Sequence, residues 1–225
     1  KKLGLLDRVK LIVLTNCTFD GLVYNVQQYM HEILAIKPDI TFFWDEAWFA
    51  FARALPHYRS RTAMYAAKKL HKRYTSAAYR EKYMQYQKEQ KKSGKNAYLM
   101  PDPDKVKIRV YATQSTHKSL SCLRQGSMIH VYDEQFETIR ENFTHAFMLN
   151  LTTSPNYQIL ATMDLARRQI ELEGYELTQH AVELSMVFRQ SVNNDPMIVR
   201  YFRALGPSEL IPESFRKSKV KSGYK

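Results

Sequence analysis

An apolar run of strand length, a helical pattern and a second apolar run most constrain how this chain can fold. Val9–Leu14 is apolar and β-branched, which is typical of a strand buried on both faces of a parallel sheet. Residues 22–34 carry apolar side chains at helical spacing until Pro38. Ile40–Trp44 is the next strand. This unit predicts an α/β fold, a mostly parallel sheet flanked by helices, with ligands at the carboxyl ends of the strands.

A second pair of expected strands encloses a lysine. Residues 106–110 alternate between apolar and basic side chains, which predicts a half-buried strand, and the apolar run 128–131 predicts a buried one. Residues 113–118 are expected to form a loop between them that carries Lys118. Burial would disfavour the charged form of this lysine, and a neutral amine can form a Schiff base with an aldehyde. Most lysines in such a context are ordinary surface residues, so the spacing alone does not decide.

The segment around this lysine resembles a known family. Residues 112–131, ATQSTHKSLSCLRQGSMIHV, are similar to the cofactor-lysine segment of the bacterial ornithine/lysine/arginine decarboxylases, pyridoxal-phosphate enzymes with the aspartate aminotransferase-like fold. The resemblance implies that Lys118 forms the Schiff base with pyridoxal 5'-phosphate and that Ser115 and His117 bind its phosphate. It covers nearly the whole chain, most specifically residues 15–64 and 106–176.

A carboxylate follows the second expected strand, in the sequence WDEAW. Aspartate is a common turn residue, which would explain Asp45 without any function. Pyridoxal chemistry, however, requires an acid beside the pyridine nitrogen to keep that nitrogen protonated. The resemblance assigns this role to Asp45, and it implies that Ala47 packs on the cofactor ring and that Trp48 lines the site. Glu46 is not expected to act with Asp45, because neighbours on an extended segment point apart.

Two further segments are similar to segments of the family. Residues 15–25, TNCTFDGLVYN, usually carry serine where Cys17 stands, and they place Asn16 near the cofactor. Residues 152–157, TTSPNY, precede an expected helix, where free hydroxyls and amides suit a phosphate or an ordinary N-cap equally well. By the resemblance, Thr153 and Ser154 reach across a dimer interface to the cofactor phosphate of the partner subunit.

The remaining segments are expected to be mainly helical. Residues 62–90 lack Gly and Pro and predict a helical segment, in one piece or two, whose tyrosines interleave with basic residues. Such a pattern suits single-stranded nucleic acid, but a packed aromatic face with solvated lysines is favoured. The expected elements also include a linker over 91–104 and a helix from Asp133 or Glu134 to Phe147. Two further helices are expected over 158–173 and 176–192, the second with an apolar core stripe.

Composition narrows the class of protein. The chain has 225 residues, a net charge of +12 and only two cysteines, Cys17 and Cys122, which gives no disulfide framework. No run approaches the roughly 20 apolar residues of a membrane span, so a soluble cytoplasmic protein is expected. No metal site is predicted. The basic balance can attract nucleic acid or acidic partners without establishing either.

The predicted function is the α-decarboxylation of a basic amino acid, lysine, arginine or ornithine, by a pyridoxal-phosphate enzyme. An aminotransferase or aldolase of the same fold is the alternative, and a basic nucleic-acid-binding or regulatory module is less favoured. The resemblance implies a homodimer with a shared active site, or a higher oligomer. Residues 1–170 are expected to form the C-terminal part of the cofactor-binding domain, with 61–104 as an insertion, and 171–225 to begin a small domain. The family's earlier phosphate loop and stacking aromatic ring are expected before Lys1.

Overall fold

The computed structural model describes residues 4–93 and 99–210. The chain divides into two compact units, residues 1–175 and 176–225. Within the described residues, the first unit contains one sheet with the strand order β1-β2-β3-β4. Its strands are β1 Leu11–Thr15, β2 Thr41–Asp45, β3 Arg109–Ser115 and β4 Ser127–Asp133.

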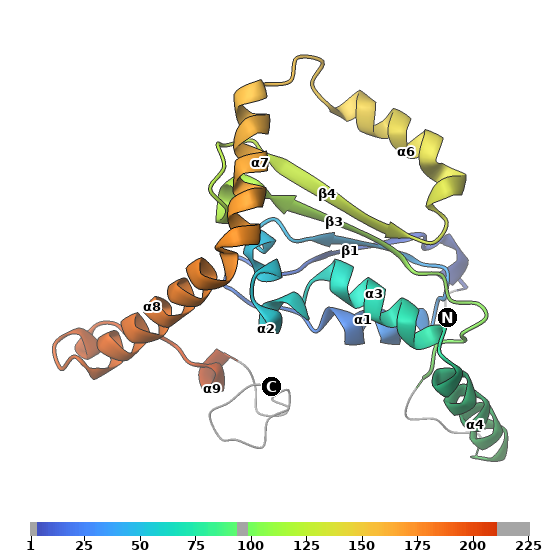
Figure 1. Cartoon of the computed structure of the whole chain (residues 1–225). Helices are drawn as coiled ribbons and strands as arrows, with labels where there is room; N and C mark the ends of the chain where they lie inside the picture. The colour runs from blue at the N-terminus through green and yellow to red at the C-terminus, as the bar shows by residue number, and fades with distance from the viewer. Residues whose placement is uncertain (1–3, 94–98, 211–225) are drawn as a thin grey trace. The chain divides into compact units, whose positions relative to one another are not determined.

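Helices connect and flank these strands (Figure 1). In the first unit they are η1 Leu6–Arg8, α1 Val26–Leu34, η2 Ala50–Arg53, α2 Pro56–Arg59, α3 Ala63–Tyr74, α4 Ala77–Ser93, α5 Thr116–Ser119, α6 Phe136–Asn150 and α7 Tyr157–Leu172. Helix α8, Gly174–Asn194, begins at the end of the first unit, and η3 Ile198–Arg200 and α9 Pro207–Leu210 follow in the second. Over the residues described, no helix has the length and apolar character that crossing a bilayer requires.

The sheet is mixed. β1 pairs with β2 and β2 pairs with β3 in parallel, which confirms the predicted strand-helix-strand unit. The expected burial of the first strand on both faces is wrong, because Leu11 and Val13 of β1 are exposed. β4 runs antiparallel to β3, from the pair Ser115 and Ser127 to the pair Arg109 and Asp133. The prediction of a buried last strand is wrong, because every residue of β4 is half-buried or exposed. β4 forms one edge of the sheet, where a strand has only one neighbour.

Helices α1 and α3 cover one face of the sheet and form the core with it (Figure 1). Met30 and Leu34 of α1 and Leu70 of α3 are fully buried, as are the alanines of α3 that let its backbone approach the strands. Trp44 of β2 lies in the same cluster. The predicted helix over 62–90 occurs in two pieces, α3 and α4, and Thr62 caps the first by accepting a hydrogen bond from the amide of Tyr65.

The tyrosines at the junction of α3 and α4 belong to this core. The rings of Tyr74 and Tyr79 are buried, with centroids 5.0 Å apart. The hydroxyl of Tyr79 donates to the carbonyl of Pro101 at 2.9 Å. These two side chains form part of the predicted packed aromatic face, whereas the other tyrosines of that pattern, Tyr65, Tyr83 and Tyr86, are only half-buried.

Several predicted boundaries differ from the structure. The helix expected from residue 22 begins at Val26, after Asn25, whose side chain accepts from the amide of Gln28. The helix expected from Asp133 or Glu134 begins at Phe136, because Asp133 still pairs with Arg109 in the sheet. The helix assigned to 62–90 continues to Ser93, and residues 94–98 of the predicted linker lie outside the described residues. In α8, the expected core stripe is exposed at its long side chains, Leu177, Leu184 and Phe188.

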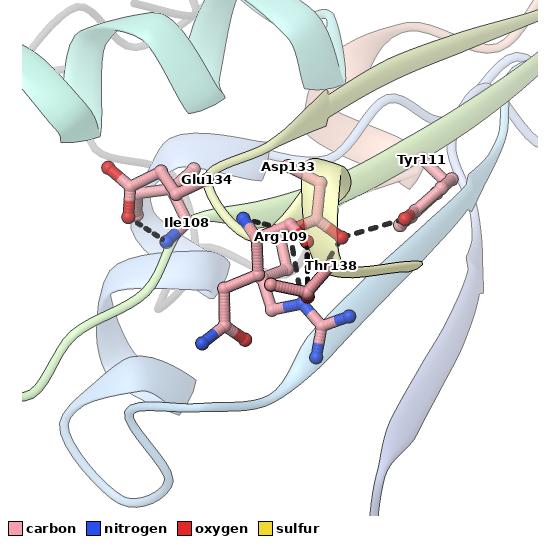
Figure 2. Close-up of polar contacts among 7 residues, drawn as sticks. Ile108, Arg109, Tyr111, Asp133, Glu134 and Thr138 are labelled. Atoms are coloured by element: carbon pink, nitrogen blue, oxygen red, sulfur yellow. Dashed lines mark hydrogen bonds and ion pairs between the residues drawn. The ribbon is translucent and has the colours of Figure 1, made fainter. Parts of the chain in front are cut away.

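A polar network fixes the amino end of β3 against the carboxyl end of β4 (Figure 2). Both carboxylate oxygens of Asp133 lie 3.1 Å from Nε of Arg109, and the hydroxyl of Tyr111 donates to one of them at 2.7 Å. The carboxylate of Glu134 accepts from the amide of Ile108 at 2.8 Å. Because the side chain of Asp133 is fully buried, this carboxylate depends on its partners for stability.

We expect the phenol of Tyr111 to make the free energy of unfolding sensitive to alkaline pH. Burial, then the hydrogen bond to Asp133, raises the pKa of Tyr111 from its usual value of 10.0 to about 12. The stabilisation is therefore complete below pH 10 and is lost as the pH rises toward 12, by about 1–2 kcal/mol. Urea unfolding across this range should show a steeper loss for the wild type than for Tyr111→Phe. The same substitution at the exposed Tyr157 is the control, and equal slopes for all three proteins would contradict the prediction.

Candidate functional site

The carboxyl ends of the three parallel strands meet at one edge of the sheet, here called the carboxyl edge. In the registers, Thr15 pairs with Asp45, and Asp45 pairs with Thr113. Two backbone hydrogen bonds continue beyond the strands, from the amide of Asn16 to the carbonyl of Asp45 at 2.8 Å and from the amide of Ser115 to the carbonyl of Ala47 at 3.3 Å. The residues predicted to follow each strand therefore lie side by side.

Lys118 lies on a short helix at this edge, and not on the predicted loop. Residues 113–115 belong to β3, where they pair with residues 127–129 of β4, and α5 begins directly afterwards. Lys118 is also exposed, so the expectation of a buried lysine is wrong for the described chain. Its reason is local: α5 is a single turn beyond the sheet edge, and the residue of that turn that faces inward is Thr116.

An aromatic pair lies beside the amine of Lys118. The Nζ atom is 5.1 Å from the centroid of the Trp48 ring, within the range of a cation–π contact. Phe19, which is 89% exposed, packs edge-on against the same indole, with centroids 6.0 Å apart. The structure thus brings Trp48 and Lys118 together, and it adds Phe19, which the sequence interpretation did not select.

Asp45 ends β2 with its carboxylate half-buried. Oδ1 accepts a hydrogen bond from the amide of Ala47 at 3.0 Å, which fixes the turn after the strand. Among the described residues, no protein group donates to the other oxygen, Oδ2. One face of this carboxylate is therefore available to a ligand, while the other is used to hold Ala47.

The residues before Lys118 are tied to Gly126, which precedes β4. The carbonyl of Gly126 accepts from the amide of Thr116 at 3.1 Å and from Nδ1 of His117 at 2.9 Å. Since Nδ1 carries the proton, Nε2 of His117 can donate to an anion only when the ring is protonated. Ser115 makes no side-chain cap on α5, and the buried hydroxyl of Thr116 has no protein partner among the described residues. The hydroxyl of the half-buried Ser115 is therefore not used to cap α5, whereas that of Thr116 is enclosed by the protein.

We expect Gly126→Ala to disturb this segment. A Cβ atom at Gly126 would lie 2.7 Å from Oγ1 of Thr116, 2.9 Å from Sγ of Cys122 and 3.0 Å from Cγ of Met163. Overpacking of this kind costs about 1–3 kcal/mol of unfolding free energy. Urea unfolding should show this loss for Gly126→Ala and a change within about 0.5 kcal/mol for the neighbouring, exposed Ser127→Ala.

A double variant tests the stated cause of that loss. Adding Thr116→Ala removes the nearest clashing atom, so it should restore part of the stability lost in Gly126→Ala. Strictly additive losses would show that the crowding at Oγ1 of Thr116 is not the cause.

Glu46 is a site residue that the sequence interpretation missed. Its side chain is completely buried, and three donors from different elements surround it. Oε1 accepts from Nδ2 of Asn16 at 2.9 Å and from the amide of Ala63 at 2.7 Å, and Oε2 accepts from Nε2 of Gln114 at 3.1 Å. Burial raises the pKa of Glu46, and the three hydrogen bonds oppose that rise. Its position one residue after Asp45 was the available signal, because it places the two side chains on opposite faces.

Asn16 supports Glu46 and has its own polar atoms occupied by protein. Besides the bond to Glu46, its Nδ2 donates to the carbonyl of Arg61 at 3.1 Å, and its Oδ1 accepts from the amide of Tyr24 at 3.2 Å. It lies at the carboxyl edge, as predicted, but its amide is engaged within the protein. The next residue, Cys17, has a φ of 64°, which is uncommon without glycine, and burial, then the charge of Glu46, raises the pKa of its thiol.

Thr153 and Ser154 lie in the exposed segment between α6 and α7. The amide of Ser154 donates to Oγ1 of Thr152 at 3.1 Å, and Asn156 caps α7. Within the part of the chain that is described, no hydrogen bond joins them to the carboxyl edge. Their contact with a partner subunit stays a prediction. The described ranges also contain no group of three His, Cys, Asp or Glu side chains that could hold a metal ion.

These features define an α/β domain whose sheet carries a lysine and a carboxylate at the carboxyl ends of adjacent strands. Residues 67–216 match the family model described as Orn/Lys/Arg decarboxylase, major domain. The chain belongs to the Orn/Lys/Arg decarboxylase family, which confirms the resemblance seen in the sequence.

Individual relatives agree with this assignment. The chain is 31% identical to the lysine decarboxylase LdcA of Pseudomonas aeruginosa over 83% of its length and 20% of the relative. It is 32% identical to the biodegradative arginine decarboxylase of Escherichia coli over 80% of its own length and 19% of that relative. Among solved structures, lysine decarboxylase A of Pseudomonas aeruginosa matches at 28% identity with a TM-score of 0.57, over 88% of the chain and 22% of that structure. The chain spans about a fifth of the length of the curated relatives it matches.

Proposed function

We propose that this chain supplies the lysine and the ring-facing acid of a pyridoxal-phosphate enzyme that decarboxylates a basic amino acid. The observation that carries the proposal is the placement of Asp45 at the carboxyl end of β2 and of Lys118 just after the adjacent parallel strand β3. The segments that follow are joined by the Ser115–Ala47 hydrogen bond and by the Lys118–Trp48 contact. Curated relatives named lysine, arginine and ornithine decarboxylases support the substrate class.

The residues at the carboxyl edge fit this cofactor. An aldehyde needs an accessible amine, and Lys118 is exposed beside an aromatic face. A pyridinium nitrogen needs a carboxylate oxygen, and Oδ2 of Asp45 is not used by described protein groups. A phosphate needs donors, and the hydroxyl of Ser115, which makes no cap on α5, meets that need. When bound, pyridoxal phosphate supplies an electron sink for the carbanion that loss of the substrate carboxylate leaves.

Each side chain has a definite task in this proposal. Lys118 would hold the cofactor through its aldehyde carbon, with release of water, and once a substrate amine had taken its place the lysine amine would be free to accept or return a proton. Asp45 holds a proton at the ring nitrogen. Trp48 lies against the amine of Lys118 and forms an aromatic wall of the site. Ser115 and the protonated ring of His117 donate to the phosphate.

The second subunit completes the proposed assembly. Thr153 and Ser154 are exposed at the start of α7, where hydroxyl and amide donors can reach a neighbouring molecule. We assign them to the cofactor phosphate of a partner in a homodimer, with a higher oligomer compatible with the same contact.

Borohydride reduction followed by peptide mapping tests the proposal. The full-length protein is incubated with pyridoxal phosphate and reduced, which fixes the cofactor on the lysine that holds it. The label is expected on the peptide that contains Lys118, and it should disappear in Lys118→Ala but persist in Lys107→Ala, an exposed lysine before β3. Stoichiometric labelling of any other lysine would overturn the assignment.

A further inference from the structure

The buried carboxylate of Glu46 lies at the centre of a hydrogen-bond chain that crosses the whole sheet. Asn16 follows β1, Gln114 belongs to β3, and Ala63 begins α3, and all three donate to Glu46. With no exposed surface, this side chain has no water to replace a lost partner. The site proposed above uses neither Glu46 nor Gln114 directly.

The hydrogen-bond chain continues to β4 through the side-chain amide of Gln114. Because its Nε2 donates to Glu46, its Oε1 must accept, and Nε2 of His130 lies 3.1 Å away. His130 therefore carries its proton on Nε2. Burial, and then the charge of Arg53, lowers the pKa of His130, which favours the neutral ring. Every donor in the chain thus points toward Glu46.

Two members of the hydrogen-bond chain are direct neighbours of residues assigned to the cofactor. Asp45 precedes Glu46, and Ser115 follows Gln114. Adjacent residues of an extended segment point to opposite faces, so anchoring Glu46 and Gln114 on one face fixes the direction of Asp45 and Ser115 on the other. The amide of Glu46 also donates to the carbonyl of Thr113 at 2.9 Å, which locks the two strand ends together.

We propose that Glu46 and Gln114 are positioning residues that hold the carboxylate of Asp45 and the Ser115–Lys118 segment in the geometry that binds the cofactor. This inference rests on the function proposed above. It assigns the two residues no contact with the cofactor or the substrate. Their effect is transmitted through the backbone of β2 and β3.

A disruptive variant and a control variant separate positioning from general stability. Glu46→Ala leaves three donors without an acceptor, and we expect its dissociation constant for pyridoxal phosphate to rise about 10-fold or more. The visible absorption of the bound cofactor should also change its dependence on pH, because Asp45 no longer faces the ring nitrogen correctly. Glu134→Ala removes a carboxylate that accepts a backbone hydrogen bond at the opposite edge, so it should lower the melting temperature without either effect.

The conservative variant should restore the binding. In Glu46→Gln, Oε1 still accepts from Asn16 and Ala63, and the new amide donates to Gln114 if the Gln114 amide turns over. Nε2 of His130 must then accept, so its proton moves to Nδ1. We expect cofactor affinity within about 3-fold of the wild type, since the geometry is kept. In cofactor-free protein, nitrogen NMR of His130 should report the change of tautomer.

Each outcome decides the inference. Wild-type affinity and an unchanged absorption profile in Glu46→Ala would overturn it. If Glu46→Ala does not fold, Gln114→Ala decides, with a loss of about 3-fold or more supporting positioning and an unchanged dissociation constant overturning it. If the wild type holds no cofactor on Lys118, the proposed function fails by itself. An unchanged His130 tautomer in cofactor-free Glu46→Gln would then independently refute the hydrogen-bond chain.

Discussion

Replacing Lys118 by alanine is expected to reduce the rate of decarboxylation by about 1000-fold or more. The substitution removes the amine that binds the cofactor aldehyde and that is proposed to move a proton during turnover. Because Lys118 is exposed on a single-turn helix, its loss creates no buried cavity, and the melting temperature should stay close to that of the wild type. The measurement is the release of carbon dioxide from lysine, arginine and ornithine, together with identification of the amine product.

The products also separate the proposed reaction from its rivals. An aminotransferase or aldolase of the same fold would lose activity in the same variant, but it would not release the α-carboxylate as carbon dioxide. Lys107→Ala serves as the control, since that lysine is exposed before β3. Full decarboxylase activity in Lys118→Ala would exclude Lys118 from the chemistry.

Asp45→Asn is expected to reduce kcat by about 100-fold to 1000-fold while the cofactor remains bound. The amide has the shape of the carboxylate, so its oxygen can still accept from the amide of Ala47 and preserve the turn. It carries no charge, however, and cannot keep a proton on the ring nitrogen. Turnover should therefore fall much more than affinity for the cofactor.

The measurement for Asp45→Asn is kcat, with cofactor content followed by absorption. Asp104→Asn provides a matched control. The side chain of Asp104 is exposed and forms an ion pair with Arg80, and both residues lie far from β2 in the sequence. A kcat equal to that of the wild type would show that Asp45 is only a turn residue, which is the alternative that its sequence position left open.

Much of the fold was predictable because its first strands are apolar and its helices are periodic. Val13 and Trp44 lie in strands placed correctly to within a few residues, and the two strands pair in parallel as the connecting helix requires. The direction of β4 was missed. Yet only the 11 residues 116–126 lie between the end of β3 and the start of β4, fewer than the roughly dozen or more that a crossover between parallel strands needs, so this short connection already favoured antiparallel pairing.

Only part of the site could be predicted from the sequence. The positions of Asp45, Trp48 and Lys118 at one edge follow from the strand order, of which the sequence pattern predicts only the parallel unit of the first two strands. The polar end of β3, Thr113–Ser115, resembles a loop in isolation, because the strand that pairs with it comes later in the chain. The role of Glu46 depends on partners from separate elements, and no local pattern contains that information.

The entry to β3 has a practical consequence for work on this protein. Arg80 and Tyr79 of α4 contact the segment that leads into β3 at its amino end, whereas Lys118 follows its carboxyl end. Most of α4 beyond Tyr79 is exposed in the residues whose burial is described, including Met84. A fluorescent dye or affinity handle attached there would sit across the sheet from the chemistry, which makes this helix a convenient place for engineering.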